Sequence, residues 1–335
     1  MNLISKLLGE LEKLLMPSNA FIAAPNKHYS SCWLRDHLYC TLCYYYLGNI
    51  PKLKKTFHVV FDILHKHLWK IDKAISITPI ESDQYIHAKV DANTFKEIIK
   101  DWGHHQLDAI GLLLYLSAFF EFKGIKVIKK KDIKIIQLLV FYLLSVRYWE
   151  KPDNGMWEET LNLHSSSIGA VLSGLCYIRK HVIVPKSMIK SGRKTFNNIL
   201  PNESPDQEVN MSQLSLIWPY NIVSEKISNI IIARIKKNLV QEHGLNRYLG
   251  DNYYKSENGT SGEWPLGFFW ISIAEFQRVN IKEAEKWLFK GIDQITDKDR
   301  IAELYCNGSP NINSPLGWAH SFAIIALIKL KKFSI

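Results

Sequence analysis

Apolar residues recur along most of this chain at spacings of three and four, which is the pattern of helices that bury one face. The pattern predicts about twelve helices and hardly any strand. The expected helices cover residues 2–16, 33–48, 52–69, 106–122, 132–149, 166–181, 186–199, 208–218, 222–240, 265–278, 281–296 and 316–332. Residues 75–93 alternate in part between apolar and polar side chains, which predicts an extended excursion or a small hairpin. The sequence therefore predicts an all-α fold.

Aromatic, charged and histidine residues gather in segments that precede alternate helices. These segments span residues 31–39, 101–111, 154–169, 247–270 and 302–320, and the intervening helices begin without such segments. The alternation is expected if every second helix belongs to an inner ring, because the loops at their N-termini then converge on one pocket. No Pro- or Ser-rich linker divides the chain, so we predict a single (α/α)6 barrel domain over residues 1–335.

Composition narrows the class of protein. Apolar residues make up 47% of the chain and charged residues 22%, which supplies a substantial core and argues against disorder. The formal charge of +10 raises the question of a nucleic-acid partner. The lysines, however, form short clusters at the ends of apolar segments, without interleaved aromatic residues, which favours a solvated surface. We therefore expect no nucleic-acid partner.

Cysteines, histidines and the N-terminal segment bear on cofactors and location. The pair Cys40 and Cys43 lies in an aromatic helical run rather than after a strand, so a redox motif is not expected. The adjacent His104 and His105 point in different directions on a helix or a strand, which favours structural histidines over metal ligands. The N-terminus resembles an amphipathic helix rather than a signal peptide, and no apolar stretch reaches the length of a membrane span. We expect a cytoplasmic protein with no membrane association, metal or organic cofactor.

The segment Trp157-Glu158-Glu159 is the first candidate for chemistry. It follows a turn signal, and helical spacing resumes near Ser166, so Glu158 is expected on a loop that enters an inner helix. Glycoside hydrolysis needs one protonated carboxylic acid and a second carboxylate across the sugar. A neighbouring Trp and a second carboxylate keep one carboxyl group protonated, because desolvation and like charge disfavour ionisation. Two helix N-terminal glutamates stabilised by the helix dipole explain this segment alone equally well.

Glu303 is the second candidate carboxylate. It lies on a loop before the last expected helix, ahead of the turn sequence Asn307-Gly308-Ser309-Pro310. In a ring of six hairpins the third and sixth inner helices are opposite, so Glu158 and Glu303 are expected to face each other. A separation of about 6.5–9.5 Å would leave room for a water molecule and give inversion. Taken alone, Glu303 is more simply a solvated loop residue, and the joint placement is what favours catalysis.

Two Arg–Asp pairs are candidate sugar ligands. Arg35 and Asp36 follow Trp33 at the start of an inner helix, and Arg247 lies four residues before Asp251. Fixed charged donors and acceptors suit sugar hydroxyl groups. A capping Asp beside a structural Arg explains either pair as well. The chain has no Gly-rich phosphate loop and no nucleophile elbow, so a nucleotide-dependent enzyme or a serine hydrolase finds no support.

Five motifs follow one another in order along the chain. They are Trp33-Leu34-Arg35-Asp36, Trp102-Gly103-His104-His105-Gln106-Leu107-Asp108, Trp157-Glu158-Glu159, Arg247-Tyr248 with Asp251-Asn252-Tyr253-Tyr254, and Glu303 upstream of Pro315-Leu316-Gly317-Trp318-Ala319-His320. In this order they resemble the motifs of the glycoside hydrolase family 15 glucoamylases and of their relatives, the regulatory subunits of phosphorylase kinase. The resemblance covers most of the chain and implies the (α/α)6 barrel independently.

The resemblance also implies a role for each motif. Glu158 would be the general acid and Glu303 the general base of an inverting, exo-acting hydrolase. This enzyme would release glucose from the non-reducing end of an α-glucan or a small α-glucoside. The residues implied to bind the substrate are Trp33, Arg35, Asp36, Trp102, Gln106, Asp108, Trp157, Glu159, Arg247, Asp251, Glu263 and Trp318.

A second class of function is also compatible with the motifs. His87-Ala88-Lys89 and Gly262-Glu263-Trp264-Pro265 look more like the kinase subunits, which suggests a non-catalytic sugar-binding or regulatory module that keeps the pocket. The presence of both Glu158 and Glu303 favours the enzyme. The choice among α-1,4, α-1,6 and α,α-1,1 linkages and the oligomeric state stay open.

Overall fold

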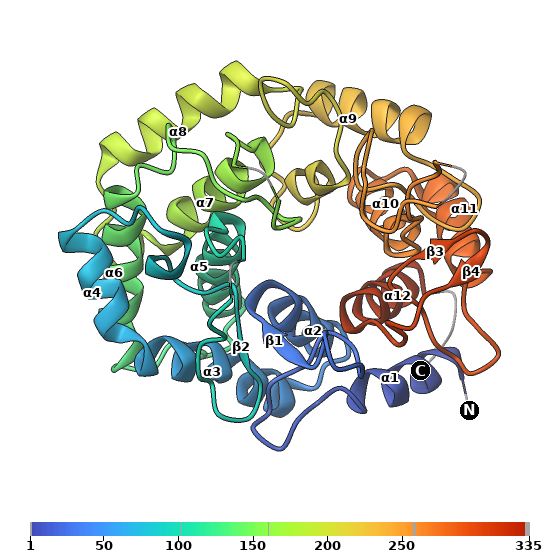
Figure 1. Ribbon diagram of the computed structural model, residues 1–335, viewed down its shortest axis with the longest axis horizontal. Helices are drawn as coiled ribbons and strands as arrows, with labels where there is room; N and C mark the ends of the chain where they lie inside the picture. The colour runs from blue at the N-terminus through green and yellow to red at the C-terminus, as the bar shows by residue number, and fades with distance from the viewer. Residues whose placement is uncertain (1, 101, 160, 257–258, 332–335) are drawn as a thin grey trace. The chain divides into compact units, whose positions relative to one another are not determined.

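The computed structural model describes residues 2–100, 102–159, 161–256 and 259–331, most of which are helical (Figure 1). The chain divides into two compact units, one formed by Met1–Asn49 with Val209–Ile335 and the other by Ile50–Glu208. That residues 1–335 form a single domain stays a prediction. Five residues of the expected segments and helices lie outside the described residues: Asp101, Thr160, Glu257, Asn258 and Lys332.

The elements of each unit follow in chain order. The unit Ile50–Glu208 contains α3 (Ile50–Lys66), α4 (Leu68–Ser76), the 3-10 helix η1 (Ser82–Gln84), β2 (Lys89–Asp91), α5 (Leu107–Phe122), α6 (Asp132–Ser145), α7 (Ser165–Ile178) and α8 (Lys186–Ile199). The other unit contains α1 (Leu3–Glu12), β1 (Ser31–Trp33), α2 (Leu34–Tyr46), the 3-10 helix η2 (Met211–Leu216), α9 (Glu225–Asn238), α10 (Leu266–Gln277), α11 (Ile281–Ile292), β3 (Tyr305–Cys306), β4 (Ser309–Pro310) and α12 (Gly317–Leu330).

The helices are of two kinds, as the alternation of polar segments predicts. Helices α5, α7, α10 and α12 are apolar on almost every side, and nearly all of their residues are buried. Helices α3, α8, α9 and α11 bury one face and expose the other. A helix that is apolar all round must be surrounded by protein, whereas an amphipathic helix covers it from one side. The polar site segments therefore enter the buried helices.

Helices α5 and α7 lie side by side in the unit Ile50–Glu208 (Figure 1). Their contact passes through glycines, because a Cβ atom on Gly111 would lie 2.5 Å from the backbone of Ala170 and Val171. A Cβ atom on Gly174 would lie 2.7 Å from the carbonyl oxygen of Gly111. Any side chain at either position would force the helices apart. This close approach fixes the N-termini of both helices, which hold the segments around Trp102 and Glu158.

In the other unit, α12 packs against α2 and α10 around an aromatic cluster. The rings of Tyr39 and Trp318 are stacked with centroids 5.1 Å apart, and Phe322 meets Tyr39 edge to face at 5.0 Å. Trp218 and Trp270 also lie against Phe322. Aromatic pairs in these geometries contribute beyond the area that they bury. The cluster secures the start of α12, where Trp318 lies.

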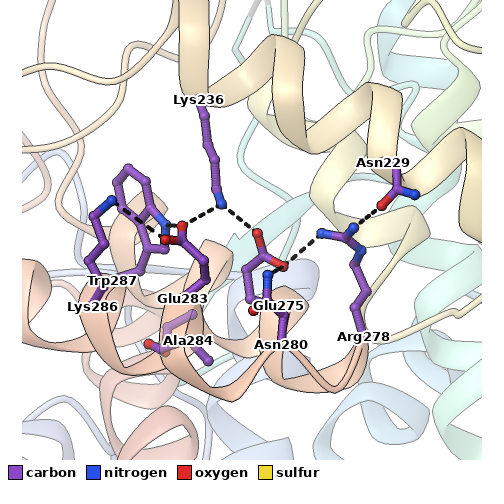
Figure 2. Close-up of polar contacts among 10 residues, drawn as sticks. Asn229, Lys236, Glu275, Arg278, Asn280, Glu283, Ala284, Lys286 and Trp287 are labelled. Atoms are coloured by element: carbon purple, nitrogen blue, oxygen red, sulfur yellow. Dashed lines mark hydrogen bonds and ion pairs between the residues drawn. The ribbon is translucent and has the colours of Figure 1, made fainter.

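Charged side chains join α9, α10 and α11 on the outside of the same unit (Figure 2). The buried carboxylate of Glu275 accepts hydrogen bonds from Lys236 and, at 2.7 Å, from Arg278. Lys236 also donates to Glu283 at 2.8 Å, and Glu283 accepts from the Trp287 indole at 3.1 Å. The two cationic partners offset the cost of removing the Glu275 carboxylate from water, which a lone buried charge would bear in full.

One expectation about secondary structure is wrong, and another is confirmed only in part. Residues 208–218 form no α-helix but the short 3-10 helix η2, in which Asn210 caps Ser212 and exchanges hydrogen bonds with Gln213. The expected helix 52–69 ends at Lys66, and α4 then begins at Leu68 and occupies the start of the segment expected to be extended. The rest of that segment contains β2, which pairs Val90 with Glu97 across a turn, so a small hairpin does form at its end.

Candidate active site

The loop of residues 153–162 carries Trp157, Glu158 and Glu159. Asp153 and Asn162 close it with two backbone hydrogen bonds of 2.9 Å, and α7 begins three residues later at Ser165. Glu158 has a φ of +64°, in the left-handed region that residues with side chains rarely adopt. Such a conformation costs about 1–3 kcal/mol and persists only where the surrounding structure imposes it. The loop therefore holds Glu158 in one imposed orientation.

The segment that begins at Trp102 imposes this orientation. The Trp102 indole donates a 2.9 Å hydrogen bond from Nε1 to Oε2 of Glu158. Asn154 exchanges hydrogen bonds with the backbone of His105 and donates to the carbonyl oxygen of Glu159. Gly103 permits the contact, because a Cβ atom there would lie 2.8 Å from the Glu158 carbonyl oxygen. The structure thus brings the side chains of Trp102 and Glu158 and the backbone of Glu159 close together.

Gln106 and Asp108 lie at the N-terminus of α5 and are both buried. The Gln106 side chain donates to the Gly103 carbonyl oxygen at 2.7 Å, which shapes the turn after Trp102. Asp153 accepts from the backbone N–H of Leu107 at 3.0 Å, and burial raises its pKa to about 6. Trp157 is half-buried on the loop. Both side chains are thus enclosed at the start of the helix that follows Trp102.

A buried ion pair holds the far end of the same loop. His164 Nδ1 lies 3.2 Å from Glu203, which also accepts from the hydroxyl groups of Ser165 and Ser166 at 3.0 and 2.5 Å. Burial alone would lower the pKa of His164, but the hydrogen bond to Glu203 and the attraction of Asp153 raise it to about 9. Glu203 thereby places a carboxylate at the N-terminus of α7, where the helix dipole favours it.

Glu303 is almost fully enclosed, with 1% of its surface exposed. Its Oε1 accepts from the Tyr29 hydroxyl at 2.5 Å, and its Oε2 accepts from Asn311 and Asn313 at 2.7 and 2.5 Å. Burial raises the pKa of Glu303, whereas the hydrogen bonds from Tyr29, Asn313 and Asn311 oppose the rise. The three donors favour the ionised carboxylate and fix its plane.

Tyr29 joins Glu303 to two other predicted motifs in the same unit. Its ring stacks on Trp33 with centroids 5.5 Å apart, and its hydroxyl lies 2.5 Å from the hydroxyl of Tyr253. The Tyr253 ring in turn lies 4.9 Å from the guanidinium carbon of Arg247. Trp33, Arg247 and Glu303 are thus brought together around one tyrosine.

Arg247 and Asp251 form a buried bidentate pair, with hydrogen bonds of 2.7 and 2.6 Å from Nε and Nη2. This geometry is the strongest that these two side chains can form. Glu263 accepts from the backbone N–H of His243 at 2.6 Å, and its own backbone pairs with Tyr305. The carboxylates of Asp251 and Glu263 therefore each fix a neighbouring loop.

Arg35, Asp36 and Trp318 lie at the starts of α2 and α12. Arg35 is buried, and its guanidinium carbon lies 5.8 Å from the centre of the Trp318 ring. Trp318 itself is 3% exposed within the aromatic cluster of α12. Asp36 is in the first turn of α2, where an acidic residue is stabilised by the helix dipole. Trp318 thus packs against the guanidinium group of Arg35.

The motifs did not identify several residues that hold the Glu303 carboxylate and the backbone of Glu159. Tyr29, Asn311 and Asn313 around Glu303, and Asn154 beside Glu159, are absent from the predicted site. Their only signal in the sequence is position, because each lies within about ten residues of a predicted site residue in a segment rich in turn formers. An asparagine in such a segment is usually a turn residue, so the sequence alone does not single these out.

His104 and His105 pack as structural residues. His104 stacks on His87 with ring centroids 3.7 Å apart, and His105 stacks on Tyr85 at 3.9 Å. Burial lowers the pKa of His104 to about 4 and that of His105 to about 3. In the described part of the chain, His, Cys, Asp and Glu side chains form no group of three or more that could hold a metal ion. Nor do the described residues include a helix both long and apolar enough to cross a membrane.

The fold of this chain is that of the glucoamylase-type glycosidases. A wild-type glycosidase superimposes with a TM-score of 0.82 at 18% identity, covering 98% of this chain and 96% of that protein. Glucoamylase from Hormoconis resinae gives a TM-score of 0.70 at 12% identity, covering 98% and 72%. A bacterial glucoamylase complexed with acarbose gives 0.69 at 15% identity, covering 98% and 55%. These likenesses confirm the prediction of an all-α fold of the (α/α)6 barrel class.

The chain belongs to glycosyl hydrolases family 15, whose family model matches residues 12–179. It is also similar to the alpha regulatory subunit of phosphorylase b kinase from rabbit skeletal muscle, with 26% identity over 379 residues and 90% of this chain covered. A probable alpha regulatory subunit from Drosophila melanogaster is 25% identical over 293 residues, with 72% of this chain covered. The chain spans 30% of the length of the rabbit protein and 23% of the fly protein. The family resemblance drawn from the five motifs is confirmed.

Proposed function

We propose that this protein is an inverting, exo-acting α-glucosidase of glucoamylase type, and that its two compact units work as one catalytic domain. Glu158 donates a proton to the glycosidic oxygen, and Glu303 activates a water molecule that attacks the anomeric carbon from the opposite face. The bond between glucose and the leaving oxygen breaks as the bond to water forms. The proton lost by the water goes to Glu303. The reaction as proposed needs no metal ion or organic cofactor.

The observation that carries this proposal is the hydrogen bond from Trp102 to Glu158 on a backbone with positive φ. Strained backbone conformations cluster at functional sites. A glutamate that merely begins a helix would need no such strain, so the positive φ of Glu158 favours a functional role. One carboxylate oxygen accepts from the Trp102 indole, and in this proposal the other oxygen carries the catalytic proton. Trp102 and Trp157 then form apolar walls on which a pyranose ring packs.

The surroundings of Glu303 support its role as base. A base must be ionised before it can accept a proton, and three neutral donors stabilise the ionised form without supplying a counter-charge. Arg35, Asp36 and Arg247 would bind the hydroxyl groups of the glucose unit in the reacting position. Trp33, Gln106, Asp108, Glu159, Asp251, Glu263 and Trp318 complete the proposed substrate-binding set. The proposed substrate is an α-glucan or a small α-glucoside.

Glucose release from maltose, isomaltose and a longer glucan tests the assignment. Wild type is compared with Glu158→Gln and Glu303→Gln, which keep the shape of each side chain and remove its acid–base chemistry. Each substitution is expected to lower kcat by at least about 100-fold, the contribution of a general acid or base. Glu242→Gln is the matched control, because its side chain is 85% exposed. Equal rates in all four proteins would end the assignment of these residues.

The second candidate function is a non-catalytic module that binds sugar and regulates a partner. It is favoured by the similarity to subunits named for regulating phosphorylase b kinase and by the number of donors that already occupy Glu303. This function predicts that acarbose binds in calorimetry while no glucan yields glucose. Binding with turnover would support the hydrolase, and turnover lost in Glu158→Gln would exclude the module.

A further inference from the structure

Two non-helical segments of the unit Ile50–Glu208 are joined by three contacts made on ring faces. Tyr85 stacks on His105 at 3.9 Å and His87 on His104 at 3.7 Å, both between ring centroids. The third contact is between the Lys89 ammonium group and the Trp102 ring, with Nζ 3.2 Å from the ring centre. The partner numbers fall from 105 to 102 as those of the first segment rise from 85 to 89. The segments therefore run in opposite directions, and Lys89 ends the series at Trp102.

Lys89 is 5% exposed, which is unusual for a lysine. An ammonium group above an indole face is attracted by the ring electrons, and this attraction grows when water is excluded. The same indole donates its N–H to Glu158 Oε2 at 2.9 Å. Lys89, Trp102 and Glu158 thus form a continuous series of cation, ring and carboxylate. A positive charge on the ring face also polarises the N–H group that points to Glu158, which makes it a better donor.

We propose that Lys89 is a positioning residue for Glu158 and acts through Trp102. Its ammonium group holds the indole plane in the orientation from which Nε1 donates to the carboxylate. The catalytic consequence rests on the proposed function, whereas the coupling between the three side chains does not. The charged form of Lys89 is the form that holds the ring.

The electrostatic surroundings of Lys89 agree with this arrangement. Burial lowers the pKa of Lys89 to about 8, while the negative charge of Glu158 opposes the fall and the positive charge of Lys100 adds to it. His104, on the neighbouring contact, has its pKa lowered to about 4, so it is neutral where Lys89 titrates. Lys70 is paired with Glu97 at 2.6 Å. Among these neighbours, Glu158 is the acidic residue that opposes the fall of the Lys89 pKa.

The test follows the indole N–H signal of Trp102 by nuclear magnetic resonance in protein carrying 15N-labelled tryptophan. The signal is identified as the one absent from Trp102→Phe. Between pH 6 and 10 it is expected to shift with a midpoint near pH 8 in the wild type, as Lys89 loses its charge. Lys89→Arg keeps a charge that does not titrate, so the step should vanish while the signal stays near its low-pH position.

Glu158→Gln supplies the reciprocal measurement. Removal of the acidic group should move the midpoint of the Trp102 titration downward by about one pH unit. A Trp102 signal that reports the titration of some other group, remote from Glu158, would show no such shift. Lys329→Met is the matched control, because Lys329 also contacts aromatic rings, at 5.0 Å from Tyr46, and burial lowers its pKa to about 8 as well. Lys329 belongs to the other unit, and its replacement should leave the Trp102 titration unchanged.

Two results would overturn the proposal: a Trp102 signal that does not titrate near pH 8, or a step that persists in Lys89→Met. Lys89→Arg and Glu158→Gln keep the test decisive if Lys89→Met does not fold. Absence of glucose release with an intact titration would reject the proposed function and leave the coupling in place. Glucose release without the titration would reject the coupling alone.

Discussion

The hydroxyl group of Tyr29 donates a 2.5 Å hydrogen bond to Oε1 of Glu303, although 274 residues separate them in sequence. This contact fixes the orientation of the carboxylate proposed as the base. It also ties the segment before α2 to the segment before α12, within one compact unit. A hydrogen bond to an ionised group is worth more than one between neutral groups, so its loss should be measurable.

Tyr29→Phe is therefore expected to lower kcat/KM for glucose release by about tenfold, equivalent to about 1.4 kcal/mol. Loss of a donor that stabilises the charged form raises the pKa of Glu303 further. Because the base must be ionised, the acid limb of the pH profile should move to higher pH. Tyr305→Phe is the control, since the Tyr305 hydroxyl donates to the backbone of Gln294 instead. An acid limb that does not move would show that Tyr29 does not act on Glu303.

The N-terminus of α7 gives a prediction about stability and pH. The pKa of His164 is raised to about 9 from an unfolded value near 6.5, so its contribution is complete below pH 6.5 and is lost as pH rises through 9. The free energy of unfolding should fall by on the order of 2–3 kcal/mol across this window. Asp153, whose charge helps to raise the pKa of His164, itself titrates near pH 6.

Urea unfolding at pH 6.5 and pH 9.5 measures this effect by comparison of the wild type with His164→Asn. The difference in unfolding free energy between the two proteins should be large at pH 6.5 and small at pH 9.5. Lys89 and Lys329 titrate in the same window but are present in both proteins, so their effects cancel. The exposed His181 provides the control variant His181→Asn, which should follow the wild type at both pH values. A difference that stays constant with pH would refute the charged form of His164.

The positions of the buried helices could be predicted from sequence because their signals are local. Helix α5 is apolar along nearly its whole length, whereas α8 has one polar face. This difference alone predicts that α5 is surrounded by protein and that α8 is not. The 3-10 helix η2 was expected to be α-helical, because its apolar spacing does not reveal that the Asn210–Gln213 capping contacts would compete with helical ones.

In the candidate site, too, some residues could be predicted from sequence and others could not. Trp102 and Glu158 could be proposed as partners because each stands in a motif that carries its own chemistry. The roles of Tyr29 and Asn311 could not, because a tyrosine and an asparagine in turn-rich segments gain meaning only from the side chain that they contact. The pairing of Lys89 with Trp102 depends on two non-helical segments that run in opposite directions. Local spacing carries no information about such pairing.

The network of Figure 2 predicts the effect of a buried carboxylate on stability. Glu275→Gln leaves Lys236 and Arg278 without the anion that they share, and both cations are partly enclosed. The expected loss is about 2 kcal/mol of unfolding free energy, less than for a fully buried pair because water reaches both cations. Urea unfolding measures this loss, and the exposed Glu242→Gln serves as the control. An unchanged urea midpoint would show that the network contributes nothing measurable to the free energy of unfolding.

A pair of glycine substitutions tests whether the close approach of α5 and α7 limits the stability of the unit that carries Glu158. Gly111→Ala places a methyl group 2.5 Å from the backbone of Ala170, and neither helix can yield without moving the segment that follows Trp102. We expect a loss of about 2–3 kcal/mol in unfolding free energy. Gly9, in α1, has nothing within 4 Å of the same methyl position. Gly9→Ala should therefore stabilise the protein by about 0.5–1 kcal/mol, through helix propensity alone. The sign of the two effects is the decisive result, because propensity favours alanine at both positions and only the contact with α7 opposes it at Gly111.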